Sequence, residues 1–437
     1  MSTGPFSTDT EETVTTTTGS TMTLFETEAT PLSEAGQRLR NSAAEMVPLL
    51  RQEADEIERL GAMTPAVLRA LDEAGIFKLA IPIELGGFAV GARDALEVVS
   101  ELARGDGSAA WMGFVASGMR MVSMFPQPLV DDVYSVADDH VGPLCVGASV
   151  FSTTVGAARR VGDGWMISGK WAFGSGCKHA AWAAVGVEFE QDGRPGRGMA
   201  VLARDQFQIL DDWKVMGLSG TSSNGITTDG EVLVPAHRFV DMAELHQMMD
   251  EAPQRYSGLA YQTGMRGAML TVCLYNVSIA LGMALGTLEC FVEQAGKRKP
   301  FNLPYPTVAE IPSVQVTAGK ARAMINLAGT VMRRHADEVD RRARLGQDFE
   351  APEESEMTMD LVYATRLCED AINSLQVAIG SSTIALKNPI QRFVRDIRVL
   401  ASHGAIRMDP MAEINGRQAL GLPPFAMFAG GLAQVAS

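Results

Sequence analysis

The stretch "GKWAFGSGCKHAAW" (Gly169–Trp182) is decisive for the fold, because its alternating pattern is typical of a β-strand while most of the chain has helical patterns. Alternate residues of a strand share a face, so Trp171, Phe173 and Ser175 are predicted to point the same way. Such a strand can lay aromatic rings against a flat ligand ring, while the hydroxyl and free N–H groups of the flanking glycines meet its polar edge. The alternative is an ordinary barrel strand with aromatics in the core and glycines at a bend.

The same texture continues on both sides of this stretch, from about Val141 to Val240. Glycine is frequent there, and short alternating runs such as "GWMISGKWAF" and "GMAVLARD" are separated by turn residues. This spacing is typical of a small barrel or sandwich. The segment "GTSSNG" (Gly220–Gly225) has the composition of a phosphate-binding loop, but inside a β region it is expected to be a hairpin turn.

Both flanks of the β region have helical patterns. Thr64 before Pro65 is a predicted helix N-cap, and a Gly-Asp-Gly break at 105–107 separates two further helices. Beyond residue 240, four long helices are expected to form a bundle. One of them has an apolar face made by residues spaced three and four apart. These residues are Leu361, Ala364, Cys368, Ala371, Leu375 and Ile379.

The predicted architecture is therefore mainly α with a central β domain. Residues 1–30, which are Thr-rich and acidic, form an expected disordered tail. An N-terminal helical domain is expected over 31–140, a β-barrel or sandwich over 141–240 and a helical bundle over 241–437. The apolar segment Gly267–Cys290 is long enough to span a membrane, but a helix buried in the bundle explains its polar residues better.

Composition excludes several functions. The formal net charge of −15 argues against a nucleic-acid surface. The five cysteines form no CxxC pair and the six histidines no ligand spacing, so neither a metal site nor a disulfide framework is expected. No targeting segment is recognised at the N-terminus, and a cytoplasmic, reduced protein is the default expectation.

Several local patterns together resemble the acyl-CoA dehydrogenase superfamily. They are "LDEAGIFKLAIPIELGG", "WMISGKWAFGSG", "DWKVMGLSGTSSNGITTDGEVLVP", "RKPF" and "NPIQRFVRD". Three further features are similar to one branch, the monooxygenases that take reduced flavin from a separate reductase, such as 4-hydroxyphenylacetate 3-hydroxylase. These are "GDGSAAW", the spacing of Ser175, His179 and Trp182, and His403 after the "RD" pair.

A residue that a dehydrogenase needs is missing from the sequence, which also favours the monooxygenase branch. An acyl-CoA dehydrogenase needs a carboxylate base near the flavin. The family position for it, nine residues beyond Arg395, is Gly404, and the alternative stretch Ala252–Leu288 has no Asp or Glu. His403 instead offers an imidazole that can stabilise a flavin C4a-hydroperoxide or help deprotonate a phenol. The alternative is a histidine that merely caps a helix end.

The resemblance also implies a set of flavin contacts. Ser175 would bond near flavin N5, and Phe173 would pack on the isoalloxazine beside Trp171 and Gly176. Arg298 and Phe301, from a neighbouring subunit, would approach the flavin tail. Ser381 and Ser382 would lie near its phosphate. A homotetramer, reduced FMN or FAD, and molecular oxygen follow from the same resemblance.

The substrate side departs from many relatives, which carry a second histidine after Trp111. Here that region has Ser117, Met119 and Met121, which predict a more apolar pocket for a large, flat substrate. The alternative is that these methionines only pack the core. The expected pocket residues are Trp111, Ser117, Met119, Met121 and Arg266.

The predicted function is therefore the oxygenase component of a two-component flavin monooxygenase acting on an aromatic or polycyclic compound. An acyl-CoA dehydrogenase-type enzyme or desaturase and a non-catalytic scaffold of the same fold are the alternatives.

Overall fold

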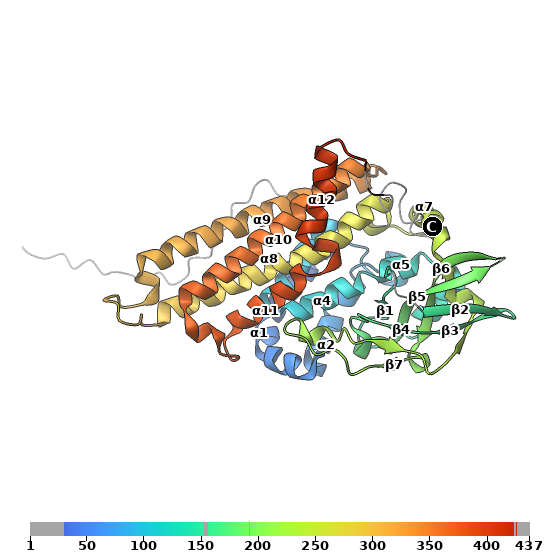
Figure 1. Ribbon diagram of the computed structural model, residues 1–437, viewed down its shortest axis with the longest axis horizontal. Helices are drawn as coiled ribbons and strands as arrows, with labels where there is room; N and C mark the ends of the chain where they lie inside the picture. Colours follow the sequence, from blue (N-terminus) through green and yellow to red (C-terminus); the bar gives the residue numbers. More distant parts are fainter. Residues whose placement is uncertain (1–29, 153–155, 192, 424, 426–437) are drawn as a thin grey trace, which may run out of the picture. The chain divides into compact units, whose positions relative to one another are not determined.

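The computed structural model describes residues 30–152, 156–191, 193–423 and 425. The predicted tail, residues 1–30, lies outside the described residues apart from Thr30. Within Leu32–Ser437, helices come first, strands follow and long helices close the chain, as predicted (Figure 1). The proposed domain boundaries at residues 140 and 240 stay a prediction.

The N-terminal helices begin and end where capping rules place them. Thr64 caps α2 by accepting the N–H of Val67, and Pro65 is its first residue. Asp106 ends one helix and caps the next, where its carboxylate accepts the N–H of Ala109 at 2.9 Å. The helices are α1 (Glu34–Leu60), α2 (Pro65–Glu73), α3 (Ala92–Gly105), α4 (Gly107–Ala116), α5 (Met119–Ser123) and α6 (Gln127–Tyr134).

The strands form two sheets. The larger has the order β10-β6-β5-β2-β3-β9, with β1 also pairing with β5, and the smaller has the order β4-β8-β7. Pairs between neighbours in sequence, such as β5 and β6, are antiparallel, whereas β1 and β2 run parallel to β5. The larger sheet contains β1 (Cys145–Ala148), β2 (Gly156–Val161), β3 (Gly164–Ser168), β5 (Trp182–Gln191), β6 (Arg194–Ala203), β9 (Val232–Pro235) and β10 (Phe239–Asp241). The smaller contains β4 (Lys170–Trp171), β7 (Gln208–Ile209) and β8 (Ile226–Thr227).

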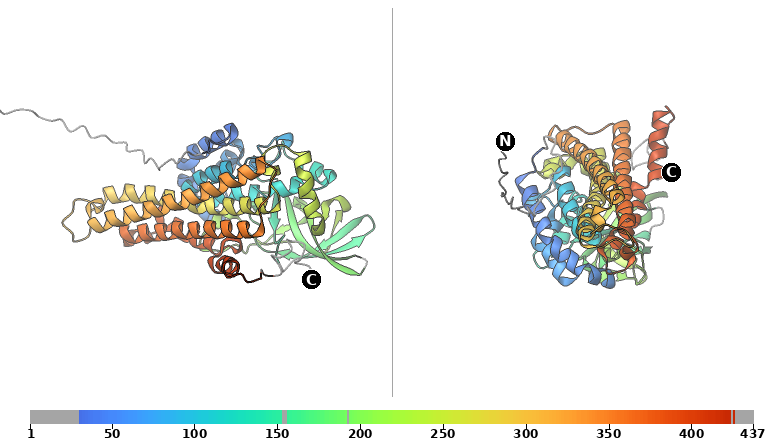
Figure 2. Two further views of the ribbon diagram at one scale, coloured as in Figure 1. Left: turned by 90° about the horizontal axis from the view of Figure 1, so that it is seen from above. Right: turned by 90° about the vertical axis from the view of Figure 1, so that its left-hand side faces the viewer.

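The C-terminal helices form the expected bundle, in which α8, α9 and α10 lie side by side (Figures 1 and 2). The predicted apolar face of α10 is buried along its whole length, from Leu361 to Ile379. The helices are α7 (Leu245–Arg255), α8 (Met265–Lys297), α9 (Pro312–Arg344), α10 (Ala351–Ile379), α11 (Pro389–Ala401) and α12 (Met408–Ala419).

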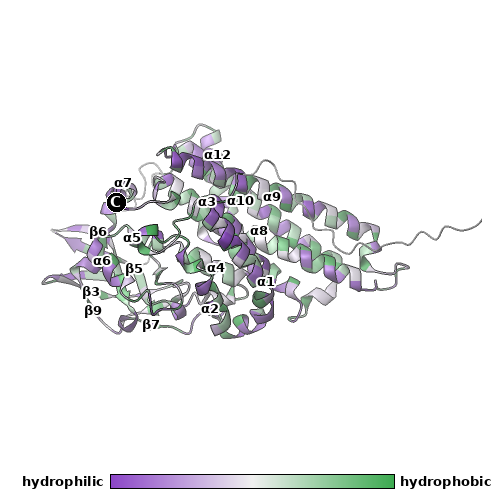
Figure 3. Ribbon diagram, turned by 180° about the vertical axis from the view of Figure 1, so that it is seen from behind, coloured by the Kyte–Doolittle hydropathy of each residue, from purple (hydrophilic) through white to green (hydrophobic). Residues whose placement is uncertain are grey.

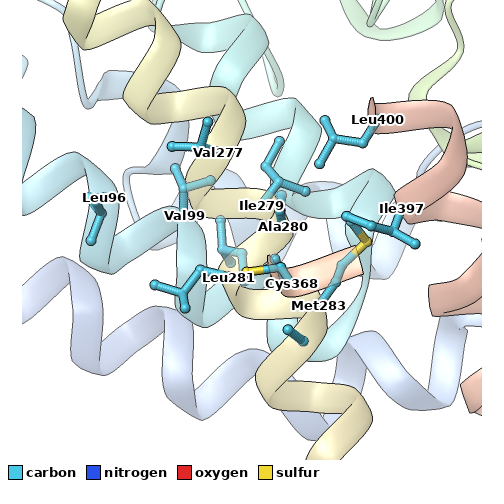
Figure 4. Close-up of a cluster of buried hydrophobic side chains, with 14 of the residues drawn as sticks. Leu96, Val99, Val277, Ile279, Ala280, Leu281, Met283, Cys368, Ile397 and Leu400 are labelled. Atoms are coloured by element: carbon cyan, nitrogen blue, oxygen red, sulfur yellow. The ribbon is translucent and has the colours of Figure 1, made fainter. Parts of the chain in front are cut away.

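Helix α8 is the centre of the core. It is long and apolar enough to cross a membrane, but most of its apolar stretch is buried against α3, α10 and α11. Figure 4 shows Val277, Ile279 and Leu281 of α8 packed among Val99, Cys368 and Leu400 of these neighbours. Hydrophilic residues dominate the outer helices α1 and α12 instead (Figure 3). This burial agrees with the prediction of a core helix.

The three parts of the chain meet around two buried carboxyl groups, Asp106 and Asp396. Asp396 of α11 accepts the N–H of Leu218 at 2.6 Å, in the loop that follows β7. A side chain on Gly217 would collide with the α11 backbone at Arg395, so the loop can approach only as glycine. Arg395 adds bonds to Met216 O and to Glu58 of α1, both at 2.7 Å. We call this set, Glu58, Asp106, Met216–Leu218, Arg395 and Asp396, the junction.

The junction makes stability depend on pH. Burial and the neighbouring Asp106 raise the pKa of Asp396 to about 7, although the Leu218 N–H, Arg395 and Arg392 oppose the rise. Because the folded protein binds this proton more tightly than the unfolded chain, stability is lost as pH rises through about 7.

We therefore expect Asp396→Asn, which keeps the acceptor for Leu218 but cannot ionise, to gain stability over wild type as pH rises from 5.5 to 8.5. The gain in thermal midpoint should be about 1–3 °C. Thermal unfolding at both pH values is the measurement. Asp55→Asn, at an exposed carboxylate that pairs with Arg392, is the control and should show no such trend. An equal offset at both pH values for Asp396→Asn would contradict the account.

Candidate active site

The strand that carries the predicted flavin contacts ends earlier than expected. β4 stops at Trp171, whose side chain is fully buried and whose indole N–H donates to Gly186 O at 2.7 Å. Phe173 adopts a left-handed backbone (φ +57°), which breaks the alternation of faces. The prediction that Trp171 and Phe173 share a face is therefore wrong. Trp171 packs in the β core, which was the alternative, and has no surface left for a cofactor.

Phe173 itself is presented outward. Its side chain is 68% exposed, and its ring meets that of Trp213 edge-on with centroids 6.3 Å apart. The indole N–H of Trp213 is buried and has no hydrogen-bond partner among the described residues. An exposed aromatic ring on strained backbone, beside an unused donor, is a surface suited to stacking on a flat ligand.

The glycine-rich turn after Phe173 does not have the free N–H groups that were predicted. The backbone N–H groups of residues 174–177 all donate within the protein. Gly174 donates to Asn224 O, Ser175 to Phe173 O, Gly176 to Thr221 O and Cys177 to Gly174 O, at 2.9–3.0 Å. That part of the prediction is wrong, because the turn is held against the loop after β7 by these same groups.

Ser175 keeps an unusual set of partners. Its hydroxyl lies 2.7 Å from that of Ser223, and the Ser223 hydroxyl lies 2.8 Å from that of Thr221. Thr221 in turn donates to Leu218 O at 2.8 Å. Thr221 and Ser223 belong to "GTSSNG" (Gly220–Gly225), which is not the expected hairpin turn. This run begins inside η5 (Ser219–Thr221), is buried, and lies in the long connection between β7 and β8.

His403 lies just beyond α11, at the start of η11 (Gly404–Ile406). Its ring packs edge-on against Trp111 at 5.4 Å and Phe114 at 6.4 Å. Nδ1 accepts the N–H of Ala405, so the neutral ring carries its proton on Nε2, which has no partner among the described residues. Burial lowers the pKa of His403, which keeps the imidazole neutral near pH 7. The histidine does cap a short helix, as the alternative required, but only with one nitrogen.

Helix α4 brings the serine loop and the histidine together. A Cβ on Gly176 would lie within 3.3 Å of Met112 and Val115, so this loop packs against one face of α4. His403 packs on Trp111 and Phe114, which lie on the neighbouring face of the same helix. The indole N–H of Trp111 is buried and has no partner among the described residues. Ser175 and His403 thus flank one helix from two sides.

The predicted flavin-tail residues lie elsewhere. Arg298 and Phe301 follow the end of α8, and Ser381 and Ser382 lie in η10 (Ser381–Ile384), before α11. Hydrogen bonds between Gln294 and Asn388 hold these two segments together. His403 is at the opposite end of α11, a helix of 13 residues, or about 20 Å. Within one chain, these four residues therefore form a set separate from Ser175 and His403.

The predicted substrate-pocket residues divide into two groups. Met119 is fully buried in a cluster with Val122 and Phe125, so it packs the core and its assignment to a pocket is wrong. Met121 and Ser117 are half-buried, and the Ser117 hydroxyl donates to Phe114 O. Arg266 pairs with Glu354 at 2.8 Å, which neutralises its charge.

Four residues near these positions had not been predicted. Phe114 packs against His403, and Trp213 packs against Phe173. Ser223 lies next to Ser175. Arg120 is a half-buried cation with no carboxylate partner among the described residues, and it donates to Ala260 O and Thr263. The hydroxyl-rich run "GTSSNG" was a usable signal for Ser223, and a lone arginine between methionines was one for Arg120.

Comparison with known families agrees with this arrangement. Residues 33–127 match the acyl-CoA dehydrogenase N-terminal domain, and residues 274–408 match its C-terminal domain. Together the two matches cover more than half of the chain. The chain belongs to the acyl-CoA dehydrogenase superfamily. The predicted fold class, with its helical flanks and central sheets, is thereby confirmed.

The relatives that this chain matches over most of their length include flavin-dependent monooxygenases. The chain is 28% identical to the flavin-dependent monooxygenase oxygenase subunit HsaA of Rhodococcus jostii, over 86% of this chain and 97% of that protein. It is 22% identical to the p-hydroxyphenylacetate 3-hydroxylase oxygenase component of Acinetobacter baumannii, over 89% and 90%. The structure of HsaA from Mycobacterium tuberculosis superposes with a TM-score of 0.78 at 26% identity, covering 90% of this chain and all of that one. The predicted branch of the superfamily is confirmed.

The strain at Phe173 gives a test of its role. Phe173→Gly removes a left-handed Cβ, which costs about 1–2 kcal/mol in a folded chain, and loses little buried surface. We expect the apoprotein of Phe173→Gly to be more stable than that of Phe173→Ala by about 0.5–1 kcal/mol, measured by urea unfolding. Both variants should bind flavin more weakly than wild type. Equal flavin affinity in all three proteins would show that the exposed ring has no part in binding.

Proposed function

We propose that this chain is the oxygenase component of a two-component flavin monooxygenase. It receives reduced FMN or reduced FAD from a separate NAD(P)H:flavin reductase and oxygenates an aromatic or polycyclic compound with molecular oxygen. The observation that carries the proposal is His403. A neutral imidazole beside Trp111 occupies the loop in which a dehydrogenase would carry its carboxylate base, and Gly404 stands at the base position itself.

The residues around Ser175 fit a flavin ring. Phe173 offers an exposed face for stacking, Trp213 an unused N–H, and Ser175 a hydroxyl oxygen. When bound in its reduced form, the flavin supplies the electrons that activate oxygen. The protein's part is to position the ring and to exclude water with the apolar walls formed by Trp111 and Phe114. His403 Nε2–H donates a hydrogen bond to an oxygen atom held beside it.

The region where α5, α7 and the start of α8 meet is rich in methionine. Met121, Met124, Met249 and Met265 belong to or border one cluster, packed around Tyr256 and Tyr261. The thioether side chains adapt to flat, irregular shapes. Arg120 lies beside Tyr261, with its guanidinium carbon 6.0 Å from the ring centroid. We assign to this region a large apolar substrate that carries one hydrogen-bond acceptor for Arg120.

A second copy of the chain completes the site in this proposal. Arg298, Phe301, Ser381 and Ser382 are about one length of α11 away from His403, so they reach a flavin only from a neighbouring subunit. The same end of the bundle exposes large apolar side chains, including Phe301, which is 89% exposed. The others are Leu303, Val377, Ile384 and Leu386. A cytoplasmic homotetramer would cover this surface.

The function is tested by isotope incorporation. The protein is supplied with reduced FMN by a flavin reductase, NADH and ¹⁸O₂, together with a panel of phenols and polycyclic aromatics. We expect one heavy oxygen atom in a product of at least one compound. A panel that yields only hydrogen peroxide, together with acceptor-dependent oxidation of an acyl thioester, would favour the dehydrogenase alternative.

His403→Ala should reduce the yield of oxygenated product per flavin by at least about tenfold, because it removes the only donor assigned to the bound oxygen. Its thermal midpoint should stay within about 2 °C of wild type. The matched control is His246→Ala, at an exposed histidine of α7, which should change neither quantity. Normal coupled turnover in a folded His403→Ala protein would remove the histidine from the mechanism.

Assembly is tested at the exposed end of the bundle. Ile384→Asp places a charge in the proposed contact between copies, so we expect a smaller particle by light scattering and weaker flavin binding, even though Ser175 and Phe173 are intact. Leu233→Asp, at an exposed leucine of β9, should leave both unchanged. A monomeric wild-type protein that binds flavin tightly would contradict the assignment of these residues.

A further inference from the structure

The hydroxyl chain from Ser175 to Leu218 has only one allowed direction. A carbonyl can only accept, so the single hydroxyl proton of Thr221 is committed to Leu218 O. The contact between Thr221 and Ser223 then requires Ser223 to donate. Ser223 has no second proton, so in its contact with Ser175 the proton must come from Ser175. The Ser175 oxygen is left with lone pairs alone for any further partner.

The backbone of the turn that carries Ser175 offers no donor to compensate. The N–H groups of residues 174–177 are each bonded to a carbonyl of the same turn or of the loop after β7. Reversing the hydroxyl chain would leave Leu218 O with only the longer bond from the Thr221 backbone N–H, at 3.2 Å. It would also set the lone pairs of the fully buried Thr221 hydroxyl and of Leu218 O against each other at 2.8 Å. Where Ser175 faces the ligand, this turn therefore presents a hydrogen-bond acceptor.

A flavin differs at N5 between its two oxidation states. Reduced flavin carries a hydrogen on N5 and donates, whereas oxidised flavin has a lone pair there and accepts. We propose that Ser223 and Thr221 are positioning residues that fix Ser175 as an acceptor, and that the site thereby prefers reduced over oxidised flavin. This inference rests on the proposed function and deepens it by assigning the redox preference to two named side chains.

The preference has a consequence for turnover. Reduced flavin is held by a hydrogen bond from N5–H to the Ser175 oxygen. After reoxidation, the lone pair on flavin N5 would face a lone pair on the Ser175 oxygen. This repulsion weakens the binding of oxidised flavin and favours its release. A component that takes reduced flavin from one protein and must discard it oxidised requires this order of affinities.

The test compares dissociation constants of reduced and oxidised FMN, measured anaerobically and aerobically by flavin fluorescence or absorbance. In Ser223→Ala, Ser175 is free to turn its proton towards the ligand, so oxidised FMN gains a donor. We expect the ratio of the oxidised to the reduced dissociation constant to fall at least about tenfold. The midpoint potential of bound FMN should then fall by about 30 mV, the two-electron equivalent of that change.

Ser222→Ala is the matched control. Ser222 is the preceding residue, and its hydroxyl is buried without a partner among the described residues, so its removal deletes the same atoms without touching the chain. The ratio should equal that of wild type. Thr221→Val breaks the chain at its other link and should change the ratio in the same direction as Ser223→Ala. This second variant decides the question if Ser223→Ala does not fold.

The outcomes separate this inference from the proposed function. Wild-type protein that binds neither form of FMN or FAD would overturn both. Wild-type protein that prefers reduced flavin, with an unchanged ratio in folded Ser223→Ala or Thr221→Val, would overturn only the role of the hydroxyl chain. An equal fall in Ser222→Ala would also overturn it, since the effect would then come from disturbance of the loop.

Discussion

The structure depends on one buried contact between parts of the chain that are far apart in sequence. Asp396 on α11 accepts the backbone N–H of Leu218, while Asp106 caps α4 close by. Burying these carboxyl groups is costly, because burial raises the pKa of both, and the nearby Asp106 raises the pKa of Asp396 further. The cost is offset because the contact positions three elements together: α4 with Trp111, the loop with Ser223, and α11 with His403 at its end. Each of these elements supplies one wall of the candidate site.

The candidate site is defined less by charged side chains than by which of its groups donate hydrogen bonds and which accept them. The proton of Ser175 is committed to the protein, the histidine is neutral, and the carboxylate base of a dehydrogenase is missing at Gly404. What remains is an acceptor at Ser175, donors at His403 Nε2 and at the indole N–H groups of Trp111 and Trp213, and aromatic surface from Phe173 and Phe114. Such a site is suited to a neutral or weakly polar ring system, and none of the described residues assigned to it is a carboxylate.

Sequence rules predicted the elements whose causes are local. The cap at Thr64, the break at Asp106 and the buried face of α10 follow from capping and periodicity alone. The failures arose where tertiary contacts override the local pattern. The left-handed backbone of Phe173 turns its side chain away from that of Trp171, and contacts with the loop after β7 occupy the N–H groups of the glycine turn. A methionine can line a pocket or pack the core. Met119 lies in the core, and no sequence signal distinguishes these two positions.

The roles of Ser175 and His403 were inferred from family position and from the missing base, and they stay proposals. The sequence does not predict the direction of their hydrogen bonds, because the partner of Ser175, Ser223, is 48 positions away along the chain. The separation of the flavin-tail residues from the rest of the site has a similar origin. The sequence suggested a neighbouring subunit only by resemblance, whereas the length of α11 gives a physical reason for it.

The activity proposed for this chain is to hold reduced flavin and to control its reaction with oxygen. The most direct test is to bind chemically reduced FMN without oxygen, mix it rapidly with oxygenated buffer, and follow flavin absorbance with time; a parallel run uses reduced FAD. The account predicts a lag before the absorbance of oxidised flavin returns, longer than for free flavin under the same conditions. Reoxidation of both flavins at the rate of the free cofactor would contradict it.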